Sequence, residues 1–302
     1  MDRVKSSFNI KNLEHLSGIK AHTIRIWEKR YNLFEPERTD TNIRMYDLEN
    51  LQKLLNVTLL YNNGYKISKI AALEAEEIND NVRNLIVNKD ADDWSIGLFK
   101  LAMINFDQRL FTKTFNELLE QFSFREIFKN VFVPLMNELG VLWQTNSISP
   151  SHEHFITSLV KQKIHSMCEE LQSKEVRRKD RRFVLFLPDN EIHELGLLYL
   201  YYEVLFHGFQ CVFLGQSVPI KSLSNLVDIG EPITFISYFT IEPAQDKINT
   251  YLQTFKEEIT STMDCNLWML GYQVQFIKEK ELPKQMRSFN SIEGVIEALA
   301  TV

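Results

Sequence analysis

The sequence predicts a multidomain protein of the α and α/β classes, with a small helical head, a four-helix bundle and a parallel-sheet domain in that order. Three observations predict this. Residues 1–75 hold short helical segments broken by turn signals, and residues 91–172 keep apolar side chains at helical spacing. Beyond residue 180, short apolar runs alternate with helical stretches, which is typical of a sheet covered on both faces.

Composition describes an ordinary globular chain and excludes several classes of protein. Apolar residues make up 44% and charged residues 25% of 302 residues, as in soluble domains. No apolar run approaches the roughly 18–20 residues of a membrane span, and the N-terminus lacks the apolar core of a signal peptide. Cys168, Cys211 and Cys265 are scattered without metal-ligand spacing, which indicates reduced thiols. We therefore expect a cytoplasmic protein without a membrane partner.

Charge is unevenly distributed along the chain. The net charge is −6, yet residues 1–70 hold 12 Lys and Arg against 8 Asp and Glu, a balance of +4. A basic excess over one short domain permits contacts with phosphates.

The head is predicted to be a winged helix-turn-helix. A first helix over "FNIKNLEHL" precedes a turn at Ser17-Gly18-Ile19, and a second helix carries Ile24, Trp27 and Tyr31 at helical spacing. The polar segment "FEPERTDTNIRMYD" has no helical period and is predicted to form the wing. A further helix ends near Asn63–Gly64.

Polar and basic side chains on the second helix and the wing are the candidate DNA contacts, since such a helix enters the major groove and a wing reaches phosphates. Charge alone favours the alternative of a solvated helix face. The candidates are His22, Thr23, Arg25, Lys29, Arg30, Arg38, Thr39, Asn42, Arg44 and, through its hydroxyl, Tyr46.

The residue pattern of this segment resembles that of the MerR family of transcriptional regulators. "SGIKAHTIRIWEKRYNLFEPERTDTNIRMYD" contains the turn, Thr-Ile-Arg, an aromatic-Glu-Lys step, a Leu before the wing, and Arg-x-Tyr. The variant "RIWEKRY" is similar to the light- and cobalamin-linked, photoreceptor-type branch. The resemblance covers the head and implies binding to palindromic double-stranded DNA as a homo-oligomer, either a dimer or a tetramer.

The bundle, over 91–172, follows an acidic segment expected to be a linker (76–90) or a solvated helix. Trp143 is followed after nine residues by Glu153-His154, which alone indicates a core aromatic and a surface pair. The pattern resembles the helical cap of MerR-like photoreceptors, in which Trp, Glu and His lie over the upper face of adenosylcobalamin. In the light-sensing members a His follows the Trp. Gln144 stands there in this chain, and an amide is a poor cobalt ligand, which argues against that photochemistry.

The parallel-sheet domain, over 180–302, follows the basic hinge "SKEVRRKDRR". Its expected strands are "FVLFLP", "CVFLG", "ITFISYF" and "NLWML", with a fifth strand and a closing helix in the tail. After the first strand, Glu191, His193 and Gly196 resemble the Asp-x-His-x-x-Gly motif of flavodoxin-like, cobalamin-binding domains, with Glu in place of Asp. The resemblance implies that His193 is the lower cobalt ligand, that Glu191 orients its imidazole, and that Gly196 lets a helix start beneath the corrin. Without its neighbours, His193 reads as an ordinary loop histidine.

Other segments of this domain preserve or alter that pattern. Leu214, Gly215 and Pro219 match a Leu-Gly-x-x-x-Pro loop. The cobalamin-binding domains that this segment resembles carry Ser-x-Leu and Gly-Gly around a buried nucleotide tail, and this chain has Ser237-Tyr238-Phe239 and Gly271-Tyr272 there. The resemblance therefore implies an altered tail slot, which the Tyr272 ring would fill unless it points away. The candidate cofactor-binding residues are Trp143, Glu153, His154, Glu191, His193, Gly196, Gly215, Ser237 and Gly271.

Three functions fit these observations. We expect a non-enzymatic transcriptional regulator, in the repressor sense, with a module that senses adenosylcobalamin or methylcobalamin and controls oligomerisation and DNA binding. An alternative is a cobalamin-independent regulator whose degenerate module serves dimerisation or another ligand. A corrinoid methyltransferase carrier protein is disfavoured by the head and by the absence of a nucleophile–base pattern or Gly-rich phosphate loop in the sequence.

Overall fold

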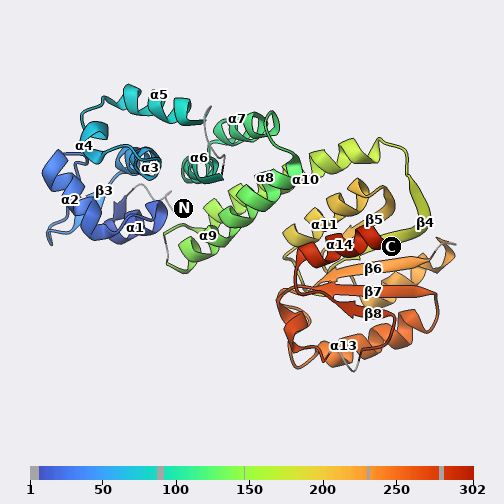
Figure 1. Cartoon of the computed structure of the whole chain (residues 1–302). Helices are drawn as coiled ribbons and strands as arrows, with labels where there is room; N and C mark the ends of the chain where they lie inside the picture. The colour runs from blue at the N-terminus through green and yellow to red at the C-terminus, as the bar shows by residue number, and fades with distance from the viewer. Residues whose placement is uncertain (1–6, 87–91, 146, 230–231, 279–281) are drawn as a thin grey trace. The chain divides into compact units, whose positions relative to one another are not determined.

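The computed structural model forms two compact units, residues 1–160 and 161–302. Figure 1 shows that the first unit is mainly helical and that the second holds a sheet with helices. No helix in the described part of the chain has the length and apolar character that crossing a bilayer requires. The structure describes residues 7–86, 92–145, 147–229, 232–278 and 282–302.

The head contains the predicted turn and wing. Asn9 caps the first helix through a capping box with Asn12, and Gly18 ends that helix in the left-handed region, at φ 75°, where a side chain would add strain. The three-stranded sheet is antiparallel, in the order β1-β3-β2. The elements of this part of the head are β1 (Phe8–Asn9), α1 (Ile10–Ser17), α2 (Ala21–Tyr31), β2 (Glu37–Arg38) and β3 (Arg44–Tyr46).

Three further helices complete the head: α3 (Leu48–Asn62), α4 (Ile67–Ile70) and α5 (Ala75–Ile86). The acidic segment is therefore helical over most of its length. Ile78 and Val82 are buried, and α5 packs on α3, so the segment is an amphipathic helix of the head.

The bundle forms around stacked aromatic rings. Phe99, Phe111, Phe115 and Phe132 are fully buried, and the rings of Phe99 and Phe111 are 4.8 Å apart, a spacing at which aromatic pairs stabilise a core. A π-helical segment, η1 (Phe128–Phe132), joins α8 to α9. The bundle helices are α6 (Asp92–Asn105), α7 (Gln108–Leu119), α8 (Phe124–Ile127), α9 (Val133–Gln144) and α10 (Pro150–Gln172), the last of which continues into the second unit.

The second unit holds a five-stranded parallel sheet in the order β5-β4-β6-β7-β8, the flavodoxin-like order. The predicted fifth strand is present. The first strand begins at Arg178, inside the segment that was expected to be a hinge. Contacts with neighbouring strands hold this part of the chain in the sheet. The Arg178 guanidinium lies 4.0 Å from the Phe209 ring centroid, and Arg182 pairs in register with Ile233. The strands are β4 (Arg178–Phe186), β5 (Phe209–Gly215), β6 (Ile233–Tyr238), β7 (Cys265–Leu270) and β8 (Met286–Ser288).

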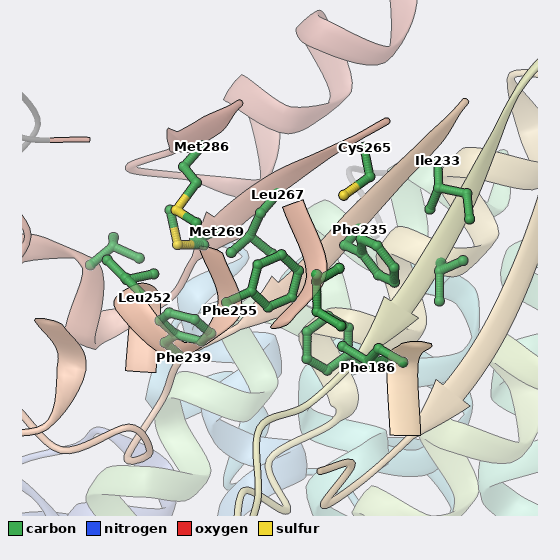
Figure 2. Close-up of a cluster of buried hydrophobic side chains, with 14 of the residues drawn as sticks. Phe186, Ile233, Phe235, Phe239, Leu252, Phe255, Cys265, Leu267, Met269 and Met286 are labelled. Atoms are coloured by element: carbon green, nitrogen blue, oxygen red, sulfur yellow. The ribbon is translucent and has the colours of Figure 1, made fainter. Parts of the chain in front are cut away.

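Helices cover both faces of the sheet. Phe186, Phe235 and Phe239 pack beneath α13 on one face, where Figure 2 shows Phe255 and Leu252 among the buried side chains. Helices α11 and α14 contact each other, and α11 packs on β4, β5 and β6. The helical segments are α11 (Leu195–Phe206), α12 (Ile220–Leu223), η2 (Ser224–Ile229), α13 (Ile248–Phe255), η3 (Lys256–Thr260), η4 (Tyr272–Phe276) and α14 (Ile292–Thr301).

The strand order reverses direction at β4, between its neighbours β5 and β6. In open α/β sheets, ligands bind beyond the carboxyl ends of the strands at such a switch point. The loop that follows β4 carries Glu191 and His193, so the fold places these residues at the expected position.

Candidate functional site

Helix α2 presents an exposed polar face. Ile24 and Trp27 are buried and hold the helix on the head's core, and the Trp27 ring meets the Tyr61 ring edge-on at 5.1 Å. Thr23 is half-buried. The other candidates on this helix are exposed: His22, Arg25, Lys29 and Arg30.

The wing is fixed to α2 through one carboxylate. Arg44 donates from Nε to both oxygens of Glu28, at 2.9 and 3.2 Å, which raises the pKa of Arg44. The Tyr46 hydroxyl donates to the same carboxylate at 2.9 Å, and Tyr46 is fully buried. Burial and this hydrogen bond raise the pKa of Tyr46. The expectation that the Tyr46 hydroxyl faces DNA is wrong in this structure, because the hydroxyl is engaged with Glu28 inside the head.

The wing tip is held by short side-chain contacts. Arg38 donates from Nη1 to Asn42 Oδ1 at 2.6 Å, and the Thr39 hydroxyl accepts the backbone N–H of Ile43 at 3.1 Å. Asn42 has φ 60°, a left-handed turn conformation that Asn tolerates. Arg38, Thr39 and Asn42 are all exposed, so they remain available for phosphate contacts.

The residues expected over the upper face of a corrin lie in the first unit. Trp143 is in α9, and its side chain, like that of Gln144, lies outside the described residues. On α10, His154 is exposed and Glu153 is half-buried, accepting from the Thr157 hydroxyl at 3.3 Å.

A neighbouring histidine, which was not among the predicted site residues, is buried beside the Glu-His pair. His152 is buried, its ring stacks on Phe106 at 4.8 Å, and its Nδ1 lies 2.8 Å from Ser149 Oγ. The proximity of His152 to the Glu-His pair was a signal in the sequence, but its burial required the packing of α10 on Phe106.

The loop after β4 holds a preorganised histidine. Glu191 is 1% exposed. Its Oε1 accepts the backbone N–H of Ile192 at 2.9 Å and of His193 at 3.0 Å, and lies 2.6 Å from His193 Nδ1. Its Oε2 accepts the N–H groups of Ile241 at 2.6 Å and Glu242 at 2.9 Å. The carboxylate therefore closes its own loop and ties that loop to the segment after β6.

The balance of forces keeps this carboxyl ionised. Burial raises the pKa of Glu191, but the hydrogen bonds from the backbone N–H groups of Glu242, Ile241 and His193 and from the His193 ring outweigh it and lower the pKa to about 2. In a neutral imidazole, an ionised acceptor at Nδ1 favours the tautomer that carries its proton on that nitrogen and its lone pair on Nε2. The His193 side chain is about half exposed, so Nε2 is available to a metal ion.

A neighbouring ion pair anchors the start of α11. Glu194 accepts from Lys161 Nζ at 2.9 Å, which ties this loop to α10 within the second unit. Gly215 closes the adjacent loop at φ 78° and its carbonyl accepts the N–H of Leu187 at 2.8 Å. Gly271 sits where an added Cβ would lie 2.5 Å from the Phe239 carbonyl oxygen, so only glycine fits there.

The structure shows where the side chains of the altered motifs, Tyr238 and Tyr272, point. Tyr272 is 66% exposed and its ring contacts Phe276, so it points away from the interior. The Tyr238 ring instead lies against Gly196, where an added Cβ would meet ring atoms at 2.6 and 2.9 Å. The space that Gly196 leaves is filled by Tyr238. Ser237 is fully buried, and its hydroxyl has no hydrogen-bond partner among the described residues.

Comparisons with known proteins agree with both parts of the chain. Residues 8–77 match the MerR HTH family regulatory protein, and residues 98–166, which lie in the helical bundle of this chain, match the B12 binding domain. The HTH-type transcriptional repressor CarH of Myxococcus xanthus is 25% identical over 228 residues, covering 73% of this chain and 75% of that protein. The repressor CarA of the same organism is 22% identical over 236 residues, covering 77% and 76%.

A solved structure shares the fold. The monomethylamine corrinoid protein of Methanosarcina barkeri superposes with a TM-score of 0.50 at 14% identity, covering 76% of this chain and all of that one. The likeness supports the fold of the bundle and the flavodoxin-like domain. The chain therefore combines a MerR-type helix-turn-helix head with a B12-binding-type module, and it is homologous to the CarH and CarA repressors.

Proposed function

We propose that this protein is a non-enzymatic DNA-binding transcriptional regulator whose second unit holds cobalamin and thereby controls DNA binding. The observation that supports this most directly is the contact between the His193 imidazole and Glu191 at the switch point of a flavodoxin-like sheet. The same chain carries a MerR-type head. CarH and CarA, to which this chain is similar, are transcriptional repressors, which supports repression as the sense of regulation.

The head would bind duplex DNA through α2 and the wing. Arg25, Lys29 and Arg30 are exposed on α2, where a recognition helix contacts base edges and phosphates. The contact of Arg44 and Tyr46 with Glu28 would hold the wing at a fixed angle to α2, so that Arg38 and Thr39 reach the phosphate backbone. A single head is a small surface, and two heads on a palindromic operator would supply the remaining affinity.

The second unit fits the lower face of a corrin. His193 Nε2 would be the lower cobalt ligand, with Glu191 as its orienting partner, and the unpartnered Ser237 hydroxyl offers a buried hydrogen bond to a ligand. Cobalamin would supply a cobalt ion that an imidazole nitrogen can ligate. The Tyr238 ring fills the space at Gly196, the residue expected beneath the corrin, so binding would require this ring to turn aside. Trp143, Glu153 and His154 are proposed to cover the upper face.

Two measurements test the proposal. Gel shifts against a genomic-fragment library should return preferred fragments whose binding weakens as salt rises, because phosphate contacts release counterions. Equilibrium dialysis and visible spectra with adenosylcobalamin and methylcobalamin should show a protein-bound corrin, which His193→Ala abolishes. The control is His165→Ala, an exposed histidine of α10 in the same unit.

The possible results separate the candidate functions. DNA binding without retention of either cobalamin would favour the cobalamin-independent regulator, in which the Tyr238 ring permanently fills the space at Gly196. Cobalamin retention without any preferred DNA fragment would favour a corrinoid carrier protein. Failure of both measurements would remove the proposal.

A further inference from the structure

A cavity of about 330 Å³ lies within the first unit, where the head meets the bundle. Helices α1 and α3 of the head line one side of it, and α6 and α9 of the bundle line the other. Its volume is that of a small-molecule site and about ten times the share of one liquid water. The residues at the DNA interface and at His193 do not contribute to it.

Most of the lining is apolar. Leu16, Leu55, Leu59 and Leu142 contribute aliphatic walls, and their buried surfaces leave water few partners. Apolar walls without partner atoms forfeit dispersion contacts, which an apolar ligand restores. A lysine and a carboxylate in the lining, Lys100 and Glu138, form an ion pair with each other, so neither is left to attract a charged ligand.

Two buried polar groups in this lining lack partners among the described residues. Trp94 is 4% exposed and Thr58 is 7% exposed, and the indole Nε1–H of Trp94 and the hydroxyl of Thr58 make no hydrogen bond there. A buried donor without an acceptor is costly, and an indole N–H can only donate. An acceptor on a bound molecule would satisfy it.

We infer that this cavity is a second ligand site, separate from the corrin site, for an uncharged one- or two-ring molecule that carries a hydrogen-bond acceptor. The rings fill the apolar space, and the acceptor receives the Trp94 indole N–H. The bound molecule joins α1, the first helix of the helix-turn-helix, to α6 and α9. It therefore stabilises the packing of the head on the bundle.

A polar contact beside the cavity supports the link to the head. Ser147 is 1% exposed and lies 3.4 Å from Asn12 Nδ2 and 3.2 Å from His15 Nδ1. Both partners belong to α1, and His15 also lines the cavity. A ligand there contacts the same helix face that Ser147 holds.

Quinoline and naphthalene are the probes, because they share one shape and only quinoline carries an acceptor nitrogen. The full chain, labelled with ¹⁵N at its four tryptophans, gives indole N–H signals, and Trp94→Phe assigns one of them. Quinoline should shift the Trp94 signal saturably, with a Kd of about 1 mM for a ligand of this size. Naphthalene should bind about tenfold more weakly, since it leaves the N–H unpaired.

A matched pair of glycine substitutions locates the site. Gly97 lines the cavity, and an added Cβ there meets nothing within 4 Å, so Gly97→Leu fills the space. Gly140 is equally open but does not line the cavity, so Gly140→Leu is the control. Gly97→Leu should abolish the quinoline shift and Gly140→Leu should preserve it.

Several results would overturn the inference. They are the absence of a saturable Trp94 shift in the wild-type chain, equal binding of the two probes, or quinoline binding that survives Gly97→Leu. The comparison of the two probes on the wild-type chain does not depend on the folding of a glycine variant. None of these measurements involves DNA or cobalamin, so their failure is distinct from failure of the proposed function.

Discussion

Two carboxylates organise the two candidate sites of this protein, and they do so differently. Glu28 in the head, with 14% of its side chain exposed, accepts from the side chains of Arg44 and Tyr46. Glu191 in the second unit, 1% exposed, accepts four backbone N–H groups and contacts the His193 ring. The first fixes a wing against a helix, and the second fixes the path of a loop.

The difference matches what each site would bind. The head exposes many side chains, and phosphate and base contacts are individually modest and add up over a surface. The loop after β4 presents one imidazole with a defined tautomer, which is what a single metal–ligand bond needs. Changes at Glu191 should therefore act on one rigid element, whereas changes in the head should act one contact at a time.

The largest effect is expected for Glu191→Leu. It leaves four backbone N–H groups and the His193 ring without their acceptor, so the second unit should lose about 3–5 kcal/mol in its free energy of unfolding. Urea unfolding followed by the indole N–H signal of Trp268, which is buried in β7, measures this. Glu297→Leu, at an exposed position of α14, is the control. A loss no larger than that of the control would contradict the role given to Glu191.

A smaller effect is expected for Arg25→Ala in the head. Arg25 is exposed on α2, so the substitution should leave stability unchanged and weaken DNA binding by about 1–3 kcal/mol if the guanidinium contacts a base. Gel-shift titration on a preferred fragment checks it, with Arg109→Ala, an exposed arginine of α7, as the control. Equal affinity for both variants would remove Arg25 from the DNA interface.

Tyr46→Phe should show whether the Tyr46 hydroxyl stabilises the head or contacts DNA. It deletes the hydrogen bond from the hydroxyl to Glu28 and should lower the stability of the head by about 1 kcal/mol. The salt dependence of DNA binding should not change, because this hydroxyl is buried and makes no phosphate contact. Thermal unfolding and gel shifts at several salt concentrations measure both, with Tyr61→Phe as the exposed control. A reduced salt slope would return Tyr46 to the DNA interface.

The smallest effect is expected for Tyr272→Gly. The ring is exposed, so its removal should leave cobalamin retention in equilibrium dialysis unchanged. Tyr238→Ala is the contrasting variant, since it clears the space at Gly196 and should increase retention severalfold. If Tyr272→Gly increased retention and Tyr238→Ala did not, the obstruction would lie where the sequence alone suggested.

Much of the architecture could be predicted from local pattern. The turn at Gly18, the five strands and the closing helix α14 all follow from spacing and turn residues within a few positions of each other. The contact between Glu191 and His193 was implied by the resemblance to the Asp-x-His-x-x-Gly motif, and the two residues are near enough in the chain to meet within one loop. The acidic segment was ambiguous only because its apolar positions, Ile78 and Val82, are few.

The sequence by itself therefore determined the order of the domains, the helix-turn-helix and the local pairing of a carboxylate with a histidine. Only the tertiary structure decided that the Tyr46 hydroxyl turns inward to Glu28, that the Tyr238 ring fills the space at Gly196 while the Tyr272 ring is exposed, and that Trp94 and Thr58 share a cavity. Each of these depends on side chains from elements far apart in the chain. Local periodicity sets which face of an element is apolar, but the packing of one element on another decides which atom meets which.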